Sequence, residues 1–125
     1  MVEDMLWGSA ARNTEECALL SKLGGQVPTI VTDVHGCIIG VSTSWVTMCE
    51  YTLEEALGER PTILHGPLTN QESALDFSMQ LRVRPAFGTV VNYKKSGTVF
   101  VNHLYGWALG DILVAETYAE DTVQH

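Results

Sequence analysis

The spacing of apolar residues changes several times along the chain, and each change predicts a helix or a strand. Within residues 13–23 apolar side chains recur every three or four positions, which is the spacing of one helix face, and a glycine pair ends the run. Residues 28–32 and 37–41 are short strand-like runs on either side of a turn, which is typical of a β-hairpin. The first eight residues show no such pattern, and we expect them to be frayed.

Short helices are expected after this hairpin. Segments 42–50, 52–58 and 69–82 favour helix, and Pro85 prevents the last of them from continuing much further. Three pairs of residues have the spacing of a capping box, in which each side chain bonds the backbone N–H of the other residue: Asn13 with Glu16, Thr52 with Glu55, and Thr69 with Glu72.

Three further strands are expected in the C-terminal part of the chain, at residues 87–94, 98–109 and 112–118. The complete order predicts an α+β domain: a five-stranded antiparallel sheet with short helices packed on one face, plus an N-terminal helix. No repeat or linker separates two domains. We therefore divide the chain into an N-terminal flanking helix (1–25), one domain (26–121) and a tail (122–125).

Composition and charge narrow the class of protein. The 125 residues are 46% hydrophobic and 18% charged, and 15 acidic against 7 basic residues give a net charge of −8. An acidic chain is a poor partner for nucleic acid or an anionic membrane surface, which favour clustered Lys and Arg. No apolar run approaches the length of a membrane span, and the acidic N-terminus is unlike a secretory signal. We therefore expect a soluble, intracellular, cytoplasmic protein.

The cysteines fit that expectation. Cys17, Cys37 and Cys49 are an odd and widely scattered set without a CxxC motif. Such a set favours reduced thiols over a disulfide framework or a zinc site.

Three motifs resemble the PAS superfamily, and more narrowly its LOV (light-oxygen-voltage) branch of flavin photosensors. Residues 50–58 (EYTLEEALG) are similar to the LOV segment EYS-x-EE-x-LG, and residues 64–69 (LHGPLT) to LQGPET. Residues 92–102 (NYKKSGTVFVN) are similar to NY-x-K-x-G-x-x-F-x-N. The resemblance runs from about Pro28 to Glu120. It implies the PAS fold, with a flavin between the helices and the inner face of the sheet.

The resemblance fails at the residue that carries LOV photochemistry. In the family, a cysteine in GRNCRFLQG forms a light-driven adduct with the flavin. Here the segment reads GERPTILHG, and Pro61 stands at the place of that cysteine. Proline has no thiol, so the resemblance implies a LOV-like domain that is unable to form a cysteinyl-flavin adduct.

Two asparagines match the family's contacts to the pyrimidine edge of the flavin ring. A three-residue loop, with Gly97 in the left-handed conformation, would place Asn92 and Asn102 on the same sheet face. The resemblance then implies that both amides face FMN or riboflavin. The alternative is that they bond neighbouring backbone or water in a pocket without ligand.

Other ligand contacts match unevenly. The family's two phosphate-binding arginines correspond to Thr62 and Ser78, and Arg60, Arg82 and Arg84 could compensate or could be ordinary surface residues. The LQG glutamine becomes His65, and the glutamine of the last strand becomes Glu116, which either pairs with His65 or faces solvent. The candidate flavin-binding residues are Asn92, Asn102, Glu116, His65, Thr32, Leu104 and Arg60.

Alternation along the strands assigns residues to the two sheet faces. The predicted inner face holds Val90, Asn92, Phe100, Asn102, Leu104, Val114 and Glu116. The predicted outer face holds Val91, Tyr93, Val99, Val101, Tyr105, Leu113 and Ala115. An outer face with this many apolar residues is expected to be buried. The N-terminal helix would cover part of it, and a second copy in a homodimer or a protein partner would cover the rest. A monomer covered by residues 1–23 is the alternative.

The sequence thus favours a sensory or regulatory LOV-like PAS domain for signal transduction, with a flavin in its pocket and output through dimer or partner contacts. The alternative is a ligand-free PAS module for dimerisation or protein interaction. We do not expect an enzyme, because the histidines lack metal-ligand spacing and no nucleophile–base set can be placed. His65 with Glu116 is the one acid–base pair that could lie inside the pocket.

Overall fold

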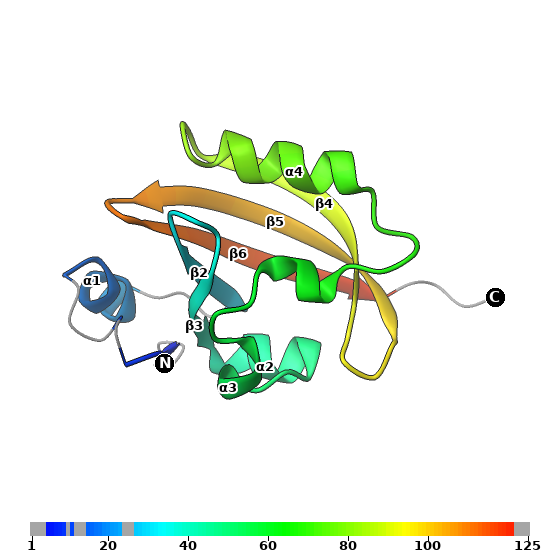
Figure 1. Cartoon of the computed structure of the whole chain (residues 1–125), viewed down its shortest axis with the longest axis horizontal. Coiled ribbons are helices and arrows are strands. Elements are labelled where there is room, and N and C mark those ends of the chain that lie inside the picture. Colours follow the sequence, from blue (N-terminus) through cyan, green and yellow to red (C-terminus); the bar gives the residue numbers. More distant parts are fainter. Residues whose placement is uncertain (1–4, 10, 12–14, 24–26, 122–125) are drawn as a thin grey trace.

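The computed structural model describes residues 5–9, 11, 15–23 and 27–121, in which six antiparallel strands form one curved sheet (Figure 1). Their order across the sheet is β1-β3-β2-β6-β5-β4. The strands are β1 (Met5–Trp7), β2 (Thr29–Asp33), β3 (Ile38–Ser42), β4 (Ala86–Tyr93), β5 (Val99–Leu109) and β6 (Ile112–Asp121).

The prediction of five strands is wrong by one. Strand β1 pairs along the outer edge of β3, with Leu6 opposite Val41. Part of the segment that we expected to be frayed therefore belongs to the sheet. Residues 24–26 and 122–125 lie outside the described part of the chain, so the domain boundaries at 25/26 and 121/122 stay predictions.

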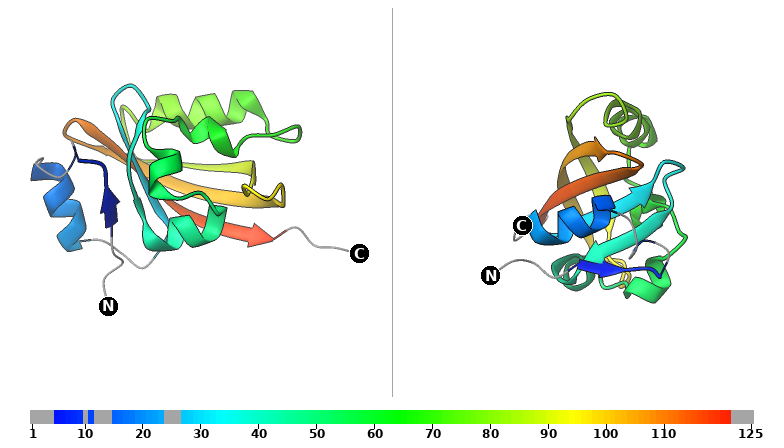
Figure 2. Two further views of the ribbon diagram at one scale, coloured as in Figure 1. Left: turned by 60° about the horizontal axis from the view of Figure 1, so that its bottom comes forward. Right: turned by 90° about the vertical axis from the view of Figure 1, so that its left-hand side faces the viewer.

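The helices between β3 and β4 lie together on one face of the sheet, as the α+β class predicts (Figure 1). The other helix, α1, lies beside β1 at the end of the sheet away from the C-terminus (Figure 2). The helices are α1 (Glu15–Leu23), α2 (Thr43–Cys49), α3 (Leu53–Ala56), the 3-10 helix η2 (Pro61–Leu64) and α4 (Gln71–Gln80). None of the described helices is long and apolar enough to cross a bilayer.

Two of the three predicted capping boxes can be compared with the structure. Thr52 and Glu55 form the complete reciprocal box at the start of α3. At α4 the prediction is off by one residue, because Asn70 is the N-cap and accepts from the backbone N–H of Ser73 at 3.0 Å. Thr69 instead accepts from Gly66 N–H and donates to the Val91 carbonyl, which ties the loop before α4 to β4. The predicted box at Asn13 lies outside the described residues.

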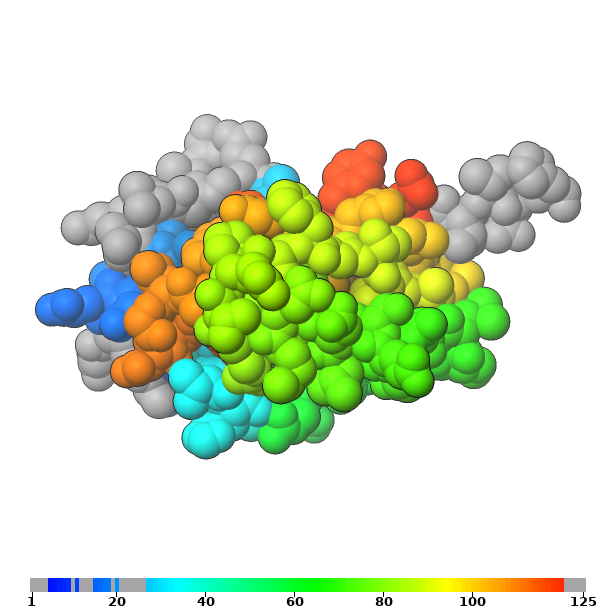
Figure 3. Space-filling model, turned by 90° about the horizontal axis from the view of Figure 1, so that it is seen from above, coloured from blue at the N-terminus to red at the C-terminus, as the bar shows by residue number. Residues whose placement is uncertain are grey.

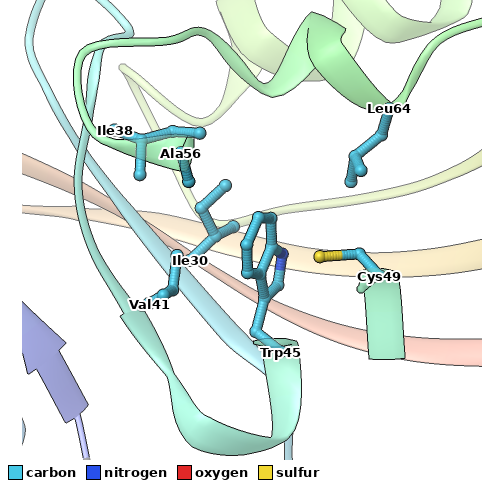
Figure 4. Packing of buried hydrophobic residues seen from close by; sticks show 7 residues of the cluster. All are labelled: Ile30, Ile38, Val41, Trp45, Cys49, Ala56 and Leu64. Atoms are coloured by element: carbon cyan, nitrogen blue, oxygen red, sulfur yellow. The ribbon is translucent and has the colours of Figure 1, made fainter. Parts of the chain in front are cut away.

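Ser42 connects the helical layer to the sheet. Its buried hydroxyl oxygen accepts from the backbone N–H of Trp45 as the N-cap of α2, and from Thr29 N–H of the neighbouring strand at 2.9 Å. These bonds fix where α2 starts and direct the indole ring into the core (Figure 4). The surrounding buried cluster consists of Ile30, Ile38, Val41, Trp45, Cys49, Ala56 and Leu64.

The lengths of two turns decide which side chains face the helices. Between β4 and β5 the loop has three residues with Gly97 at φ 96°, as predicted, so even-numbered residues of both strands face inward. Between β5 and β6 only two residues, Gly110 and Asp111, separate the last pair, Leu109 and Ile112. Across a two-residue loop, each even-numbered residue of β5 pairs with an odd-numbered residue of β6. The odd-numbered residues of β6 therefore face inward.

The predicted faces of β6 are therefore wrong. Leu113 packs inward against Phe77 and Leu81 of the α4 region, and is not part of an outer surface. Val114, placed inward by the prediction, packs on the outer side against the N-terminal segment. The inner position next to Leu104 of β5 belongs to Thr117, and Glu116 lies opposite Tyr105 on the outer face.

The N-terminal helix covers one end of the outer face. Cys17 and Leu20 of α1 pack on Val31 of β2 and Val114 of β6, with Trp107 at the edge of the cluster. Beyond it, Tyr105 contacts both Trp107 and Phe87, with ring centroids 5.4 and 4.7 Å apart, and Phe87 is 80% exposed. The predicted outer residues Val91, Val99 and Val101 are half-buried, and Tyr93 accepts a hydrogen bond from Leu68 N–H at the sheet edge.

Cys49 provides a test of how closely this core is packed. Its thiol is fully buried between Trp45 and Leu64 (Figure 4), and burial raises its pKa from 9.0 to about 11. We predict that iodoacetamide modifies half-buried Cys37 well before Cys49 up to pH 9, as measured by peptide mass spectrometry.

The same shift makes stability depend on pH. Between about pH 9 and 11 the unfolded thiol has lost its proton while the folded thiol keeps it, so the free energy of unfolding falls as pH rises. A Cys49→Ala variant should lose this part of the pH dependence in denaturant titrations. Rapid alkylation of Cys49 in the folded protein would contradict the buried placement.

Candidate functional site

A cavity of about 360 Å³ lies between the helical layer and the inner face of the sheet. This size is within the range of small-molecule sites, and most of the wall is apolar. Its strand side is lined by Ile30, Thr32, Val90, Asn92, Asn102, Leu104, Leu113, Ala115 and Thr117. Its helical side is lined by Trp45, Pro61, Thr62, Leu64, His65, Gln71, Ala74, Leu75, Phe77, Ser78 and Leu81.

The amides of Asn92 and Asn102 form a buried pair in the wall of this cavity. Asn102 Nδ2 donates to Asn92 Oδ1 at 3.0 Å, and Asn92 Nδ2 donates to the Leu64 carbonyl of η2 at 3.2 Å. Asn92 is 3% exposed and Asn102 is 1% exposed. The loop at Gly97 therefore brings the two side chains together on the inner face.

The pair leaves one strong acceptor unsatisfied. Asn102 Oδ1 is buried and has no hydrogen-bond partner among the described residues. A buried amide oxygen without a partner costs about 1–3 kcal/mol, so folded chains seldom keep one without a reason. Since Asn102 lines the cavity, a ligand there could supply the missing donor.

Trp45 is a second unsatisfied polar group in the same wall, and we did not single it out from the sequence. Its indole N–H is fully buried and unpaired within the described part of the chain, and the ring lines the cavity from α2 (Figure 4). A tryptophan at core positions of a helix is expected to serve for packing alone. The sequence pattern therefore gave no sign that its indole N–H would lie in the wall of a cavity.

The remaining candidates divide into those that reach the cavity and one that does not. His65, Thr32, Leu104 and Arg60 all line it. Glu116 is absent from the lining, as its outer-face position requires, and its place as a candidate is taken by Thr117.

No acid–base pair forms inside the cavity from the residues that we considered. Glu116 lies opposite Tyr105 on the outer face, and the ring of His65 is bonded to Gln71 through Nδ1 at 3.1 Å, so the structure does not bring His65 and Glu116 together. Within the described ranges, no group of three His, Cys, Asp or Glu side chains is placed to hold a metal ion.

Pro61 begins η2 and lines the cavity, where its ring replaces a backbone donor and offers no nucleophile. None of Cys17, Cys37 and Cys49 belongs to the lining. The described cavity wall therefore contains no thiol.

Two arginines stand where the cavity meets the β2–β3 turn. Arg60 donates to the His35 carbonyl, and Arg82 Nη1 donates to the Val34 carbonyl at 2.5 Å. Thr62 and Ser78 line the cavity beside them, whereas Arg84 borders a separate hollow near Pro85 and Trp107.

Comparison with known proteins gives structural likeness without sequence matches: no family model and no curated protein matches the chain. The LOV domain of the blue-light activated histidine kinase EL346 from Erythrobacter litoralis aligns with a TM-score of 0.70 at 18% identity, covering 78% of this chain and 99% of that domain. The Aureochrome1 LOV domain, in its light-state structure, aligns at 0.68 and 21%, covering 86% and 90%.

A third similar structure is the LOV protein of Rhodobacter sphaeroides, with a TM-score of 0.70 and 18% identity over 76% of this chain and 60% of that one. At these identities the likeness concerns the backbone architecture. The chain has the fold of LOV domains, a form of the PAS fold.

Proposed function

We propose that this chain is a sensory LOV-like PAS domain that holds a flavin, FMN or riboflavin, in the cavity and cannot form a cysteinyl-flavin adduct. The observation that carries the proposal is the unsatisfied Oδ1 of Asn102, buried beside Asn92 in the wall of a LOV-type cavity. Pro61 at the cavity wall supports the second part.

The chemistry of the wall fits the flavin ring. The pyrimidine edge of that ring has an N–H donor between two carbonyl acceptors, and Asn102 Oδ1 needs a donor. Apolar side chains such as Leu104 and Phe77 suit the flat faces of an aromatic ring, and Thr32, Thr117 and the Trp45 N–H add polar contacts. A bound flavin supplies absorption of blue light and exchange of electrons.

The signal would leave through the outer face of the sheet, towards a second copy or a protein partner. The exposed Phe87 and the neighbouring rings of Tyr105 and Trp107 form an aromatic row that α1 leaves uncovered at the β4 edge. The same row favours the second candidate function, a PAS interaction module that acts without ligand.

The flavin proposal predicts uptake by the purified protein and a specific loss in Asn102→Leu. Wild-type protein incubated with FMN or riboflavin should retain it through gel filtration, with the structured blue absorption band of a protein-held flavin. Asn102→Leu should bind at least about tenfold more weakly, because the amide that meets the ring is gone.

Stability separates this role from a structural one. The variant removes one unpartnered oxygen but leaves Asn92 Oδ1 without its donor, so the free energy of unfolding without ligand should change little. Large destabilisation of unliganded Asn102→Leu would identify the amide as structural. Failure of wild-type protein to take up either flavin would leave the interaction module as the function.

The outer-face proposal predicts self-association that depends on the aromatic row. The double variant Phe87→Glu/Tyr105→Glu places charges on the exposed stack and should shift a wild-type dimer to monomer in sedimentation velocity. Met79→Glu, at an exposed apolar residue of α4, is the matched control and should leave the dimer intact. A wild-type protein that is monomeric and recovers no partner would contradict the proposal.

A further inference from the structure

The cavity has a charged end that the motif comparison does not assign. Arg60 precedes η2 and Arg82 follows α4, yet both side chains reach the turn between β2 and β3. Figure 3 shows this turn, in cyan, lying against the yellow-green segment at the end of α4. A Cβ built on Gly36 would lie 2.9 Å from Arg60 Nη1 and 4.0 Å from Arg82 Nη2, so both guanidinium groups lie beside Gly36.

Neither arginine has a carboxylate partner within the part of the chain that the structure describes. The ion pairs among the described residues are Lys95 with Glu55 and His103 with Glu120. A guanidinium group carries five N–H donors, and the single backbone bonds to Val34 and His35 leave most of them free. Two unpaired like charges, held together in a chain of net charge −8, favour an anion between them.

The same place is where the family resemblance lacks its phosphate contacts. Thr62 and Ser78 stand at the positions of the two family arginines, and both line the cavity. Arg60 lies two residues before Thr62, and Arg82 lies four residues after Ser78, just beyond the C-terminal end of α4. The positive charges are thus displaced along the chain and remain at the cavity.

The strand register separates this end from the amide pair. Asp33, at the start of the turn, lies opposite Ile112, whereas Asn102 lies opposite Ala119. Seven residues of β6 separate the two levels, which is about 23 Å of extended strand. A ligand that uses both ends must be elongated, with a planar hydrogen-bonding head and an anionic tail.

We infer that Arg60 and Arg82 form a displaced phosphate site, which selects the phosphorylated flavin, FMN, over riboflavin. The inference rests on the proposed function for the identity of the ring, but the anion site stands on its own contacts. Thr62 and Ser78 line the same cavity as the arginines, and a hydroxyl is able to donate a hydrogen bond to a phosphate oxygen.

The test compares two ligands that differ by one phosphate. Wild-type protein should bind FMN at least about tenfold more tightly than riboflavin in fluorescence-quenching titrations, and the preference should shrink with added salt. Arg60→Gln and Arg82→Gln should each weaken FMN about tenfold and leave riboflavin unchanged. Arg84→Gln is the matched control, since Arg84 is exposed and does not line the cavity, and it should alter neither affinity.

A flavin-free readout keeps the two proposals distinguishable. Inorganic pyrophosphate should raise the thermal unfolding midpoint of wild type and Arg84→Gln, and not that of Arg60→Gln/Arg82→Gln. Uptake of both flavins with equal affinity, unaffected by these variants, would overturn the phosphate site and leave the proposed function standing. Pyrophosphate stabilisation without uptake of either flavin would overturn the proposed function and support the anion site. Wild-type protein that neither takes up a flavin nor gains thermal stability from pyrophosphate would overturn the anion site.

Discussion

The hydrogen bond between Asn102 and Asn92 is the interaction on which the site depends. It forms because a three-residue loop brings two amides to the same inner face, where Asn92 also holds the Leu64 carbonyl of η2. That second bond joins the sheet to the helical layer and helps define the far wall of the cavity. The same geometry leaves Asn102 Oδ1 without a donor among the described residues, so one arrangement both builds the cavity and gives it a polar requirement.

The wall combines this requirement with apolar surface and a cationic end. Leucines and Phe77 line most of the volume, the amides and the Trp45 N–H lie on one side, and two arginines lie at the β2–β3 turn. In a largely apolar cavity, a small number of polar groups mainly fixes the orientation of the ligand and adds less to its affinity. Pro61 lines the cavity and no described cysteine does, so in the proposed function the ligand is held without a covalent bond and its signal would come from electrons, protons or occupancy.

Local sequence patterns predicted much of this arrangement. The box at Thr52 and the left-handed Gly97 follow from short-range chemistry, which acts the same way in any fold. The faces of β6 were mispredicted because the alternation was not counted across the two-residue turn at Gly110 and Asp111, which reverses the parity between β5 and β6. Strand β1 has only three residues, too few for a periodic signal, and its pairing with β3 is a tertiary contact.

The details of the site that the sequence left undecided share one physical cause. The polar edge of Trp45, and the fact that Arg82 but not Arg84 joins Arg60 at the cavity, become visible only when distant segments are placed together. Spacing along a chain reports which side chains share an element, but not which elements meet. Thr117 is the partial exception, because counting from the β5–β6 turn would have placed it inward.

Side-chain amide NMR tests the central claim most directly. In ¹H–¹⁵N spectra of the protein titrated with FMN, the side-chain NH2 signals of Asn92 and Asn102 should shift strongly, because a donor reaches the Asn102 amide and polarises the pair. The signal of Asn70, which caps α4 with its oxygen at the surface, is the internal reference and should move little. Binding of FMN that leaves both buried amide signals unchanged would contradict the account.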